Sequence, residues 1–320
     1  MSIDVYQLAS CPACGTSSAQ AVHLFTISLL EQQCSVLRCP HCTLVYKGLM
    51  PTTNGLKKIY TESYVHFQDN LDTIDRASFF SSKQKIKRCR ALLKKSCPNE
   101  EIKLLDIGCA SGGFVNISQK MGYMAEGIDP YLPPQLQSQS LQLKSPEDVL
   151  TSSYDMAFLL NVAEHLDRPK QLFTEIHRLL KPNGVMLLTC PYGNSLARKI
   201  HQDRWGHLIL DEHLLFWTPL SLTLLLREIG FQGKVSYRIA GSPFPYGRVR
   251  KQAEEVLFEQ PEIQDLSSPS AINHKQISVQ ARVWQVARTI QRQESVANIV
   301  RSLIHFTHTG DYLEYAIAIN

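Results

Sequence analysis

The sequence predicts an α/β protein, in which a doubly wound parallel sheet follows a small cysteine-rich segment. Three observations support this fold class. Two Cys-x-x-Cys pairs lie within the first 50 residues, a unit of strand, glycine turn and helix begins near residue 100, and short apolar runs then alternate with helical patterns. The length of 320 residues leaves room for one full-sized domain and a smaller unit beside it.

The composition is typical of a globular protein with a substantial core, because 44% of the residues are hydrophobic and 19% are charged. The net charge of +4 is too small to indicate a class of partner. No apolar run reaches the ~18 residues of a membrane span, and the N-terminal sequence lacks the basic and apolar regions of a signal peptide. We therefore expect a cytoplasmic protein without a membrane span.

The first segment, residues 1–50, is predicted to bind zinc. Its two cysteine pairs, separated by 24 residues, are Cys11 with Cys14 and Cys39 with Cys42. Two such pairs, each on a tight turn, supply the four thiolates of a tetrahedral zinc site. A closed four-cysteine site leaves no position for a substrate, so the Zn²⁺ is expected to be structural in this ribbon-like segment. Free thiols in loops are the alternative, and Cys34 is a substitute ligand.

Residues 51–100 are predicted to form a helical linker or lid. The stretch SSKQKIKRCRALLKK contains seven basic residues: Lys83, Lys85, Lys87, Arg88, Arg90, Lys94 and Lys95. Apolar residues recur between them at helical spacing, among them Ile86 and Cys89, so the basic residues are expected on the outer face of a helix. A solvated face is favoured over a patch that binds phosphate or RNA.

The stretch IKLLDIGCASGGF predicts the opening unit of the sheet. It begins as a buried strand, breaks into small residues and resumes as FVNISQKMGY, which has a helical pattern. In doubly wound sheets a ligand lies beyond the carboxyl ends of the strands, where the strand order reverses. Gly108, Ala110 and Gly112 are therefore expected to line that crevice, where small side chains allow a ligand to approach the backbone.

Two adenosine-bearing cofactors compete for this crevice. Gly108, Ala110 and Gly113 fit the dinucleotide-binding fingerprint with one substitution. The middle position of that fingerprint is glycine because the backbone must approach a pyrophosphate, and the methyl group of Ala110 would crowd this contact. The chain also shows no obvious second mononucleotide unit. A cofactor without phosphates is therefore favoured.

The pattern Asp106-x-Gly108-x-Ala110-x-Gly112 resembles motif I of the class I S-adenosylmethionine-dependent methyltransferases, with alanine at the family's middle glycine. The resemblance implies a Rossmann-like, seven-stranded sheet with an antiparallel edge strand. It also implies S-adenosylmethionine as cofactor, with Asp129 accepting hydrogen bonds from both ribose hydroxyls, Asn161 near the methionine end and Ser145 near adenine. The residues predicted to bind the cofactor are Asp106, Gly108, Cys109, Ala110, Gly112, Asp129, Pro130, Ser145 and Asn161.

The resemblance covers roughly residues 100–240 well and the ends less specifically, and residues 101–320 are predicted to form the methyltransferase domain. SSYDMAFLLNVAEHL is similar to the family's fourth strand, and LFTEIHRLLKPNGVMLLTCP to the helix and strand that follow it. Thr218, Pro219 and Gly230 predict the start and the end of the last crossover helix. KVSYRIAG and DYLEYAIAIN predict the final hairpin, and residues 242–309 between them predict an inserted helical unit.

Methyl transfer is an in-line displacement, and a hydroxyl, amine or carbon acceptor also needs a base that takes its proton. Histidine suits this task near neutral pH. His165, His207 and His213 follow strand ends at the predicted crevice. The resemblance covers His165 and His213, with Glu164 and Glu212 as their orienting partners, and we predict His213 as the base, followed by His165. Hydrogen bonding of these rings to backbone groups is the alternative.

The predicted function is transfer of a methyl group from S-adenosylmethionine to a small-molecule acceptor of a biosynthetic pathway. Relatives that carry a zinc ribbon suggest a sugar-type acceptor. Tyr192, Trp205 and Phe216 either wall the acceptor pocket or belong to the core. Two other functions stay open: an RNA methyltransferase that docks RNA through the ribbon and the basic helix, and a non-catalytic module that binds S-adenosylmethionine.

Overall fold

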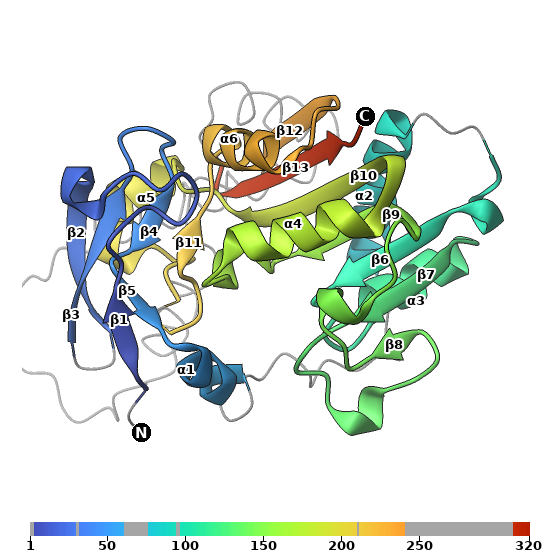
Figure 1. Ribbon diagram of the computed structural model, residues 1–320, viewed down its shortest axis with the longest axis horizontal. Coiled ribbons are helices and arrows are strands. Elements are labelled where there is room, and N and C mark those ends of the chain that lie inside the picture. Colours follow the sequence, from blue (N-terminus) through green and yellow to red (C-terminus); the bar gives the residue numbers. More distant parts are fainter. Residues whose placement is uncertain (1–2, 30–31, 61–75, 94–96, 210, 241–309) are drawn as a thin grey trace, which may run out of the picture.

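The computed structural model describes residues 3–29, 32–60, 76–93, 97–209, 211–240 and 310–320 (Figure 1). Its centre is a sheet of seven strands in the order β12-β13-β10-β9-β6-β7-β8. These strands are β6 (Lys103–Ile107), β7 (Met124–Ile128), β8 (Leu141–Gln142), β9 (Tyr154–Leu160), β10 (Leu180–Pro191), β12 (Val235–Ala240) and β13 (Tyr312–Ala318). The α/β class and the seven-stranded, Rossmann-like sheet expected from the sequence are confirmed.

The central sheet is parallel except for one strand. β8, β7, β6, β9 and β10 run parallel, whereas β13 is antiparallel to both of its neighbours, β10 and β12. The antiparallel strand therefore lies one position in from the edge. The chain order reverses at β6, because β7 and β8 extend the sheet on one side and β9 and β10 on the other. The carboxyl ends of β6 and β9 thus border the place where a doubly wound sheet binds its ligand.

Helices cover both faces of this sheet. One face carries α4 (Pro169–Leu179) and α6 (Pro219–Ile229), and the other carries α2 (Arg76–Leu92) and α3 (Gly113–Lys120). Consecutive strand residues divide between the two cores, since Leu105 packs in the first and Leu104 in the second. The strands are therefore buried on both faces, which explains why their sequences are nearly continuous apolar runs.

The ends of α6 follow the sequence signals. Thr218 Oγ1 accepts a hydrogen bond from the Ser221 N–H at 3.1 Å, and Ser221 Oγ accepts one from the Thr218 N–H at 2.9 Å. This reciprocal pair satisfies two N–H groups that have no partner within the helix. Pro219 occupies the first turn, and Gly230 ends the helix.

The N-terminal segment forms a small β unit that a distant strand completes. Its own strands are β1 (Val5–Gln7), β2 (Val22–Leu29), β3 (Gln32–Arg38), β4 (Val45–Lys47) and β5 (Leu49–Pro51). β1 pairs with β5, and the other sheet has the order β11-β4-β3-β2, in which β11 (Leu215–Phe216) follows the parallel strands of the central sheet (Figure 1). Tyr46 pairs with Leu215, and one apolar core contains both Tyr46 and Trp217. The two sheets therefore belong to one packed structure.

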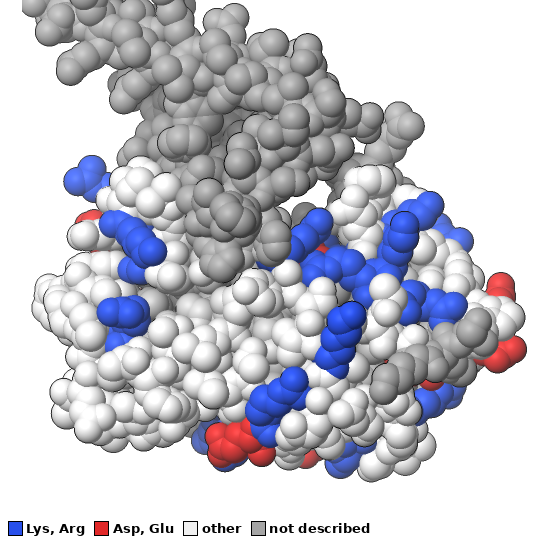
Figure 2. Space-filling view, turned by 90° about the horizontal axis from the view of Figure 1, so that it is seen from above, with Lys and Arg blue, Asp and Glu red and all other residues white. Residues whose placement is uncertain are grey.

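The predicted basic helix is α2. Lys83 and Lys87 are exposed, as expected for a solvated face. Arg88 is instead paired with Glu314 of β13, so part of the positive charge is used within the fold. Figure 2 shows lysine and arginine side chains spread over the face seen from above, with fewer acidic ones among them. The last two basic residues of the predicted set lie outside the described residues.

Two further helices complete the described part of the chain: α1 (Thr53–Lys58) and α5 (Leu196–His201). The predicted helical insertion at 242–309 and residues 61–75 of the predicted linker lie outside the described residues. Among the helices that the structure describes, none is both long enough and apolar enough to cross a membrane.

Candidate active site

A cleft of about 710 Å³ opens at the carboxyl ends of β6, β7 and β9. Six residues of the predicted cofactor site line it: Gly108, Ala110, Asp129, Pro130, Ser145 and Asn161. Both predicted catalytic histidines, His165 and His213, line it as well. Tyr60, just beyond α1, and Tyr312, at the start of β13, close further sides. The fold therefore joins most of the predicted site residues in one cavity.

The glycine turn after β6 has no room for a side chain at two of its positions, Gly108 and Gly112. Gly108 has φ +74°, and a Cβ there would lie 2.5 Å from Val162 Cγ2. Gly112, which precedes α3, has φ +83°, and a Cβ there would lie 2.5 Å from Leu141 Cδ1. Ala110 between them also has a positive φ, +44°. The turn thus brings backbone to the cleft, and Ala110 lines it.

Asp129 stands at the end of β7 with its carboxylate fixed by two backbone groups. Its Oδ2 accepts a hydrogen bond from the Ala110 N–H at 3.1 Å, and its Oδ1 accepts one from the Tyr131 N–H at 2.9 Å. Burial raises the pKa of this carboxyl, and the two N–H groups oppose the shift. Each oxygen keeps a further lone pair. The carboxylate therefore suits two neighbouring hydroxyls, such as those of a ribose.

Three predicted cofactor residues lie behind the wall of the cleft: Asp106, Cys109 and Gly112. Asp106 Oδ1 has no hydrogen-bond partner among the described residues. Burial, followed by the charge of Asp129, raises the pKa of Asp106 to about 8. Cys109 is buried and packs where a side chain on Gly127 would lie. These residues shape the turn from behind.

The two predicted catalytic histidines lie together, with ring centroids 4.8 Å apart and rings nearly perpendicular. His165 Nδ1 is 3.1 Å from Glu212 O, and His213 Nδ1 is 2.7 Å from His207 O. A carbonyl oxygen only accepts, so each Nδ1 carries a proton, and the neutral form of His213 keeps a lone pair on Nε2. Burial, followed by the charge of His165, lowers the pKa of His213 to about 3. The backbone hydrogen bonds therefore orient both rings and leave Nε2 of His213 for other contacts.

Glu164 is the third member of this cluster. Its side chain is fully buried, and neither carboxylate oxygen has a hydrogen-bond partner among the described residues. Its carboxylate lies within 4.8 Å of ring nitrogens of His165 and His213. Burial raises the pKa of Glu164 to about 8. The sequence suggested Glu164 and Glu212 as orienting partners, but Glu212 orients His165 through its backbone carbonyl.

Three tyrosines of the cleft escaped the sequence analysis. Tyr60 and Tyr131 stack with ring centroids 4.9 Å apart at 16°. Tyr312 donates from its hydroxyl to Asn161 Oδ1 at 3.1 Å. Tyr131 stands two positions after Asp129, and Tyr312 begins a predicted strand. The sequence therefore indicates only weakly that these two residues lie near the crevice. Tyr60 carried none, because only the packing of α1 brings it here.

The aromatic residues left undecided by the sequence belong to the core. Trp205 is 1% exposed, Phe216 is fully buried and Tyr192 is 3% exposed. Trp205 and Phe216 share the core of the β11 sheet, and their ring centroids are 5.1 Å apart. None of these three side chains lines the cleft that the described residues form.

A buried lysine links the N-terminal unit to the loop that carries His213. Lys47 of β4 is fully buried, and its Nζ donates to Ile209 O at 2.9 Å. Burial lowers the pKa of Lys47 to about 8, which the nearby Cys34, Asp211 and Glu212 oppose. The β unit therefore supports the loop that carries His213 through a cation as well as through strand pairing.

We expect Lys47→Met to change how stability depends on pH. The pKa of Lys47 falls from 10.5 to about 8 on folding, so the unfolded chain binds more protons between these pH values. The free energy of unfolding of the wild type should therefore rise by about 3 kcal/mol between pH 8 and pH 10.5 because of this group. Below pH 8 the buried Lys47 is charged in the folded protein, and its charge destabilises the fold by this full amount. Chemical denaturation between pH 8 and 10.5 should show a flatter dependence in Lys47→Met. Lys58→Met, at an exposed position of α1, should retain the wild-type slope, and equal slopes in all three proteins would refute the prediction.

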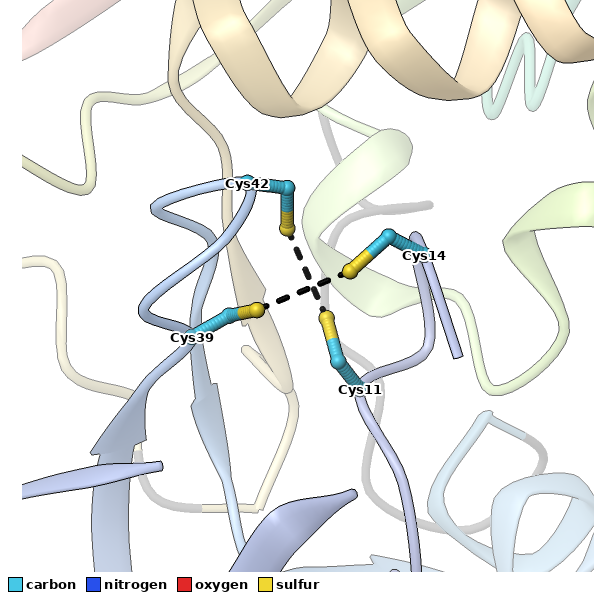
Figure 3. A group of neighbouring side chains, drawn as sticks. All are labelled: Cys11, Cys14, Cys39 and Cys42. Atoms are coloured by element: carbon cyan, nitrogen blue, oxygen red, sulfur yellow. Dashed lines mark hydrogen bonds between the residues drawn. The ribbon is translucent and has the colours of Figure 1, made fainter. Parts of the chain in front are cut away.

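The four cysteines of the N-terminal segment converge on one point (Figure 3). Cys11 Sγ lies 3.6 Å from Cys42 Sγ, Cys14 Sγ lies 3.5 Å from Cys39 Sγ, and all four sulfurs are within 4.8 Å of one another. Zinc–sulfur bonds of about 2.3 Å in a tetrahedron place the sulfurs about 3.8 Å apart, so the group fits Zn²⁺. The structure groups all four predicted ligands, and Cys34 lies elsewhere, on β3.

Two curated proteins are similar to this chain in sequence. The chain is 24% identical over 130 residues to a ubiquinone biosynthesis O-methyltransferase of Idiomarina loihiensis, which covers 37% of this chain and 51% of that protein. It is 26% identical over 158 residues to the protein of the same name from Dinoroseobacter shibae. This match covers 44% of this chain and 64% of that protein. The chain thus spans about half to two thirds of the length of these curated relatives.

The solved structures that are similar to this chain include two methyltransferases. One is a SAM-dependent methyltransferase of Archaeoglobus fulgidus, at 13% identity and a TM-score of 0.45, covering 83% of this chain and 100% of that one. The other is phosphoethanolamine N-methyltransferase 2 of Haemonchus contortus, at 14% identity and a TM-score of 0.40, covering 86% and 62%.

A family model supplies the assignment. Residues 79–235 match the family described as a methyltransferase domain. This stretch contains every parallel strand of the central sheet, the glycine turn, Asp129 and the histidine cluster. Because the matched residues are those that build the cleft, residues 79–235 are identified as a methyltransferase domain.

Proposed function

We propose that the chain transfers a methyl group from S-adenosylmethionine to a small molecule that carries a hydroxyl. One observation supports this most directly: a single cleft is lined both by the carboxylate of Asp129 and by a buried cluster of Glu164, His165 and His213. The carboxylate suits the hydroxyls of a ribose, and the cluster suits a group that loses a proton. The names of the curated relatives, which are O-methyltransferases, favour an oxygen as the accepting atom.

The residues on the cofactor side fit S-adenosylmethionine. Asp129 would bind the ribose hydroxyls, Ser145 would border the adenine, and Asn161 would face the methionine end. The bound cofactor supplies an electrophilic methyl group on a positively charged sulfur. The task of the chain is then to position the acceptor and exclude water. A cleft of about 710 Å³ is in the range that holds small ligands.

The residues on the acceptor side would remove the proton of the hydroxyl. We propose His213 as the proton acceptor and His165 as its neighbour in the same pocket. His213 Nε2 keeps a lone pair because Nδ1 is held by His207 O. The carboxylate of Glu164, within 4.8 Å of ring nitrogens of both histidines, would stabilise the imidazolium that forms. An acceptor of the sugar type is consistent with this arrangement, since it offers such hydroxyls.

We further propose that the four cysteines bind a structural Zn²⁺. Three of the four are buried, and they share an apolar core with Leu215 of β11. A tetrahedral site with four sulfur ligands has no open position, so this metal would act on folding and not on the acceptor. Residues 1–50 would then form the zinc ribbon, residues 51–100 a helical linker, and residues 101–320 the methyltransferase domain.

The test combines cofactor binding with turnover. Isothermal titration of the full chain should show binding of S-adenosylmethionine, and a panel of hydroxylated small molecules should include one that yields S-adenosylhomocysteine. His213→Gln should lower turnover by about 100-fold or more with little change in cofactor affinity, because a positioned base contributes about 10²–10⁴-fold. His23→Gln, at an exposed position of β2, serves as the control and should match the wild type.

Three outcomes would contradict this proposal. Wild-type turnover in His213→Gln would remove this residue from the reaction. Cofactor binding without S-adenosylhomocysteine from any acceptor, including bulk RNA, would favour a non-catalytic binding module. Methylation of RNA alone would favour the nucleic-acid alternative, and its binding should then weaken steeply as salt rises.

A further inference from the structure

We propose that Arg38, Arg198 and Lys199 bind a phosphate group of a small molecule, on the face of the β11-β4-β3-β2 sheet that α5 covers. None of the three residues lines the cleft described above, so this site is separate from the one that serves methyl transfer. Arg38 ends β3, and the other two residues lie in α5. The fold therefore brings together cations from two segments that are far apart in the chain.

Strand pairing directs the side chain of Arg38 toward α5. Val45 of β4 pairs with Arg38 on one side and with Phe216 of β11 on the other. Residues that are directly paired across antiparallel strands point to the same face of the sheet. Val45 and Phe216 share an apolar core with Ala197 of α5, a helix that lies beside β4 in Figure 1. Arg38 therefore projects from the face that α5 covers.

The guanidinium of Arg198 is held beside the same strands. Its Nε donates a hydrogen bond to Gly193 O. Gly193 is in close contact with β11, because a Cβ at this position would lie 2.1 Å from Phe216 O. The Gly193 N–H also donates to Trp217 O at 2.8 Å. The backbone therefore fixes the place of this guanidinium before any ligand binds.

The three cations are close enough to repel one another. Burial, followed by the charge of Arg38, lowers the pKa of Arg198. Burial, followed by the charges of Arg198 and Arg38, lowers the pKa of Lys199. A nearby carboxylate would oppose these shifts, and no carboxylate of the described residues does so. Within the part of the chain that the structure describes, the cluster is thus positive charge without a counter-charge.

The burial of Arg198 is a second, independent observation. This residue is only 5% exposed, and its Nη1 and Nη2 atoms donate to no acceptor among the described residues. The half-buried side chain of Arg38 likewise has no hydrogen-bond partner among them. A guanidinium has five N–H donors, and a charge removed from water is costly unless it is paired. An anion bound between the two arginines would satisfy both groups.

The donors select the class of anion. The planar fork of a guanidinium matches the oxygens of a phosphate, and a lysine adds a point charge. A phosphate monoester carries about −1.5 to −2 charges at neutral pH, so it suits three cations better than a singly charged carboxylate does. Nucleic acids are bound by cations repeated along a strand, whereas this cluster is compact. The site therefore fits one phosphate or diphosphate group, either free or esterified.

The test measures binding to the full chain by isothermal titration at constant ionic strength. The probes are inorganic phosphate, pyrophosphate and glycerol 3-phosphate, with acetate as the singly charged comparison. We expect pyrophosphate to bind more tightly than phosphate, and acetate not to bind. Arg38→Gln should weaken pyrophosphate binding by at least about tenfold, because a hydrogen bond to a charged group contributes about this factor or more. The order of glycerol 3-phosphate and phosphate then distinguishes an esterified from a free ligand.

The variants separate loss of the site from loss of the fold. Arg38→Gln removes no hydrogen bond within the described residues, so this variant should fold like the wild type. Arg198→Lys keeps the charge without the fork of donors, and it should bind pyrophosphate more weakly than the wild type. Lys120→Gln removes a positive charge at the exposed end of α3 and should bind pyrophosphate like the wild type. Thermal unfolding without ligand should show that all variants are folded.

Absence of pyrophosphate and phosphate binding to the wild type would overturn this site, and so would equal pyrophosphate affinity in Arg38→Gln and the wild type. Binding of bulk RNA or of phosphatidylglycerol vesicles without binding of the small probes would also overturn it, because the cations would then serve a macromolecular surface. The titrations need neither S-adenosylmethionine nor a methyl acceptor. Their outcome is therefore independent of whether methyl transfer is observed.

Discussion

Replacement of Asp129 by alanine is expected to weaken S-adenosylmethionine binding by at least about 100-fold. The carboxylate is positioned to accept hydrogen bonds from two ribose hydroxyls, and a hydrogen bond to a charged group contributes about 1.5–3 kcal/mol. Two such bonds amount to about 3 kcal/mol or more, and each 1.4 kcal/mol is a tenfold change in affinity. Alanine also frees the N–H groups of Ala110 and Tyr131, which the carboxylate now holds. Isothermal titration with S-adenosylmethionine measures the loss.

A matched control separates this effect from a general loss of negative charge. Glu147 lines the same cleft near its rim, and Glu147→Gln should change the affinity by less than about threefold, since surface charges contribute little. Circular dichroism should show that Asp129→Ala is folded before ligand is added. Equal affinity in Asp129→Ala and the wild type would show that the ribose does not bind at this carboxylate.

Replacement of Cys39 by serine is expected to abolish binding of the proposed Zn²⁺ and to unfold at least the N-terminal β unit. Structural zinc sites have apparent binding free energies of about 10–16 kcal/mol, comparable to the whole stability of a domain. Because the core around the cysteines includes Trp217 and Leu214 next to the cleft, the loss should also lower turnover. Metal analysis by mass spectrometry and a thermal unfolding scan measure the two effects.

Cys34→Ser is the control for this change. Cys34 is also a buried cysteine of the same β unit, but it lies outside the group of four sulfurs. This variant should keep one Zn²⁺ per chain and lose only the stability expected for a polar atom in a core. A Cys39→Ser protein that retains both its zinc and its melting temperature would contradict the assignment of the ligands.

The features that the sequence predicted well are local in the chain. The glycine turn and Asp129 each follow directly from a strand and its end, and Thr218 caps the helix that begins beside it. Each of the two cysteine pairs is likewise a single tight turn, and the chemistry of zinc implies that two turns meet. Such signals survive without knowledge of the tertiary structure, because the residues that make them are close in sequence.

The features that the sequence did not predict depend on contacts between distant segments. The sequence suggests Glu164 as an orienting partner, but its burial beside two histidines depends on how the loop that carries His213 packs against the segment after β9. Tyr60 stacks on Tyr131 only because of where α1 is placed. No periodic pattern in the sequence indicates these contacts, because each of them involves a single side chain and a single point of contact.

The strand that completes the N-terminal sheet also constrains how the chain is made. Thr43 and Thr218, whose hydroxyl oxygens are 2.7 Å apart, are separated by 175 residues of chain. During synthesis the N-terminal unit leaves the ribosome long before its last strand exists, and β4 stays an open edge for that time. Open edges invite pairing with other chains. Early binding of Zn²⁺ would therefore reduce aggregation while the rest of the polypeptide is still being translated.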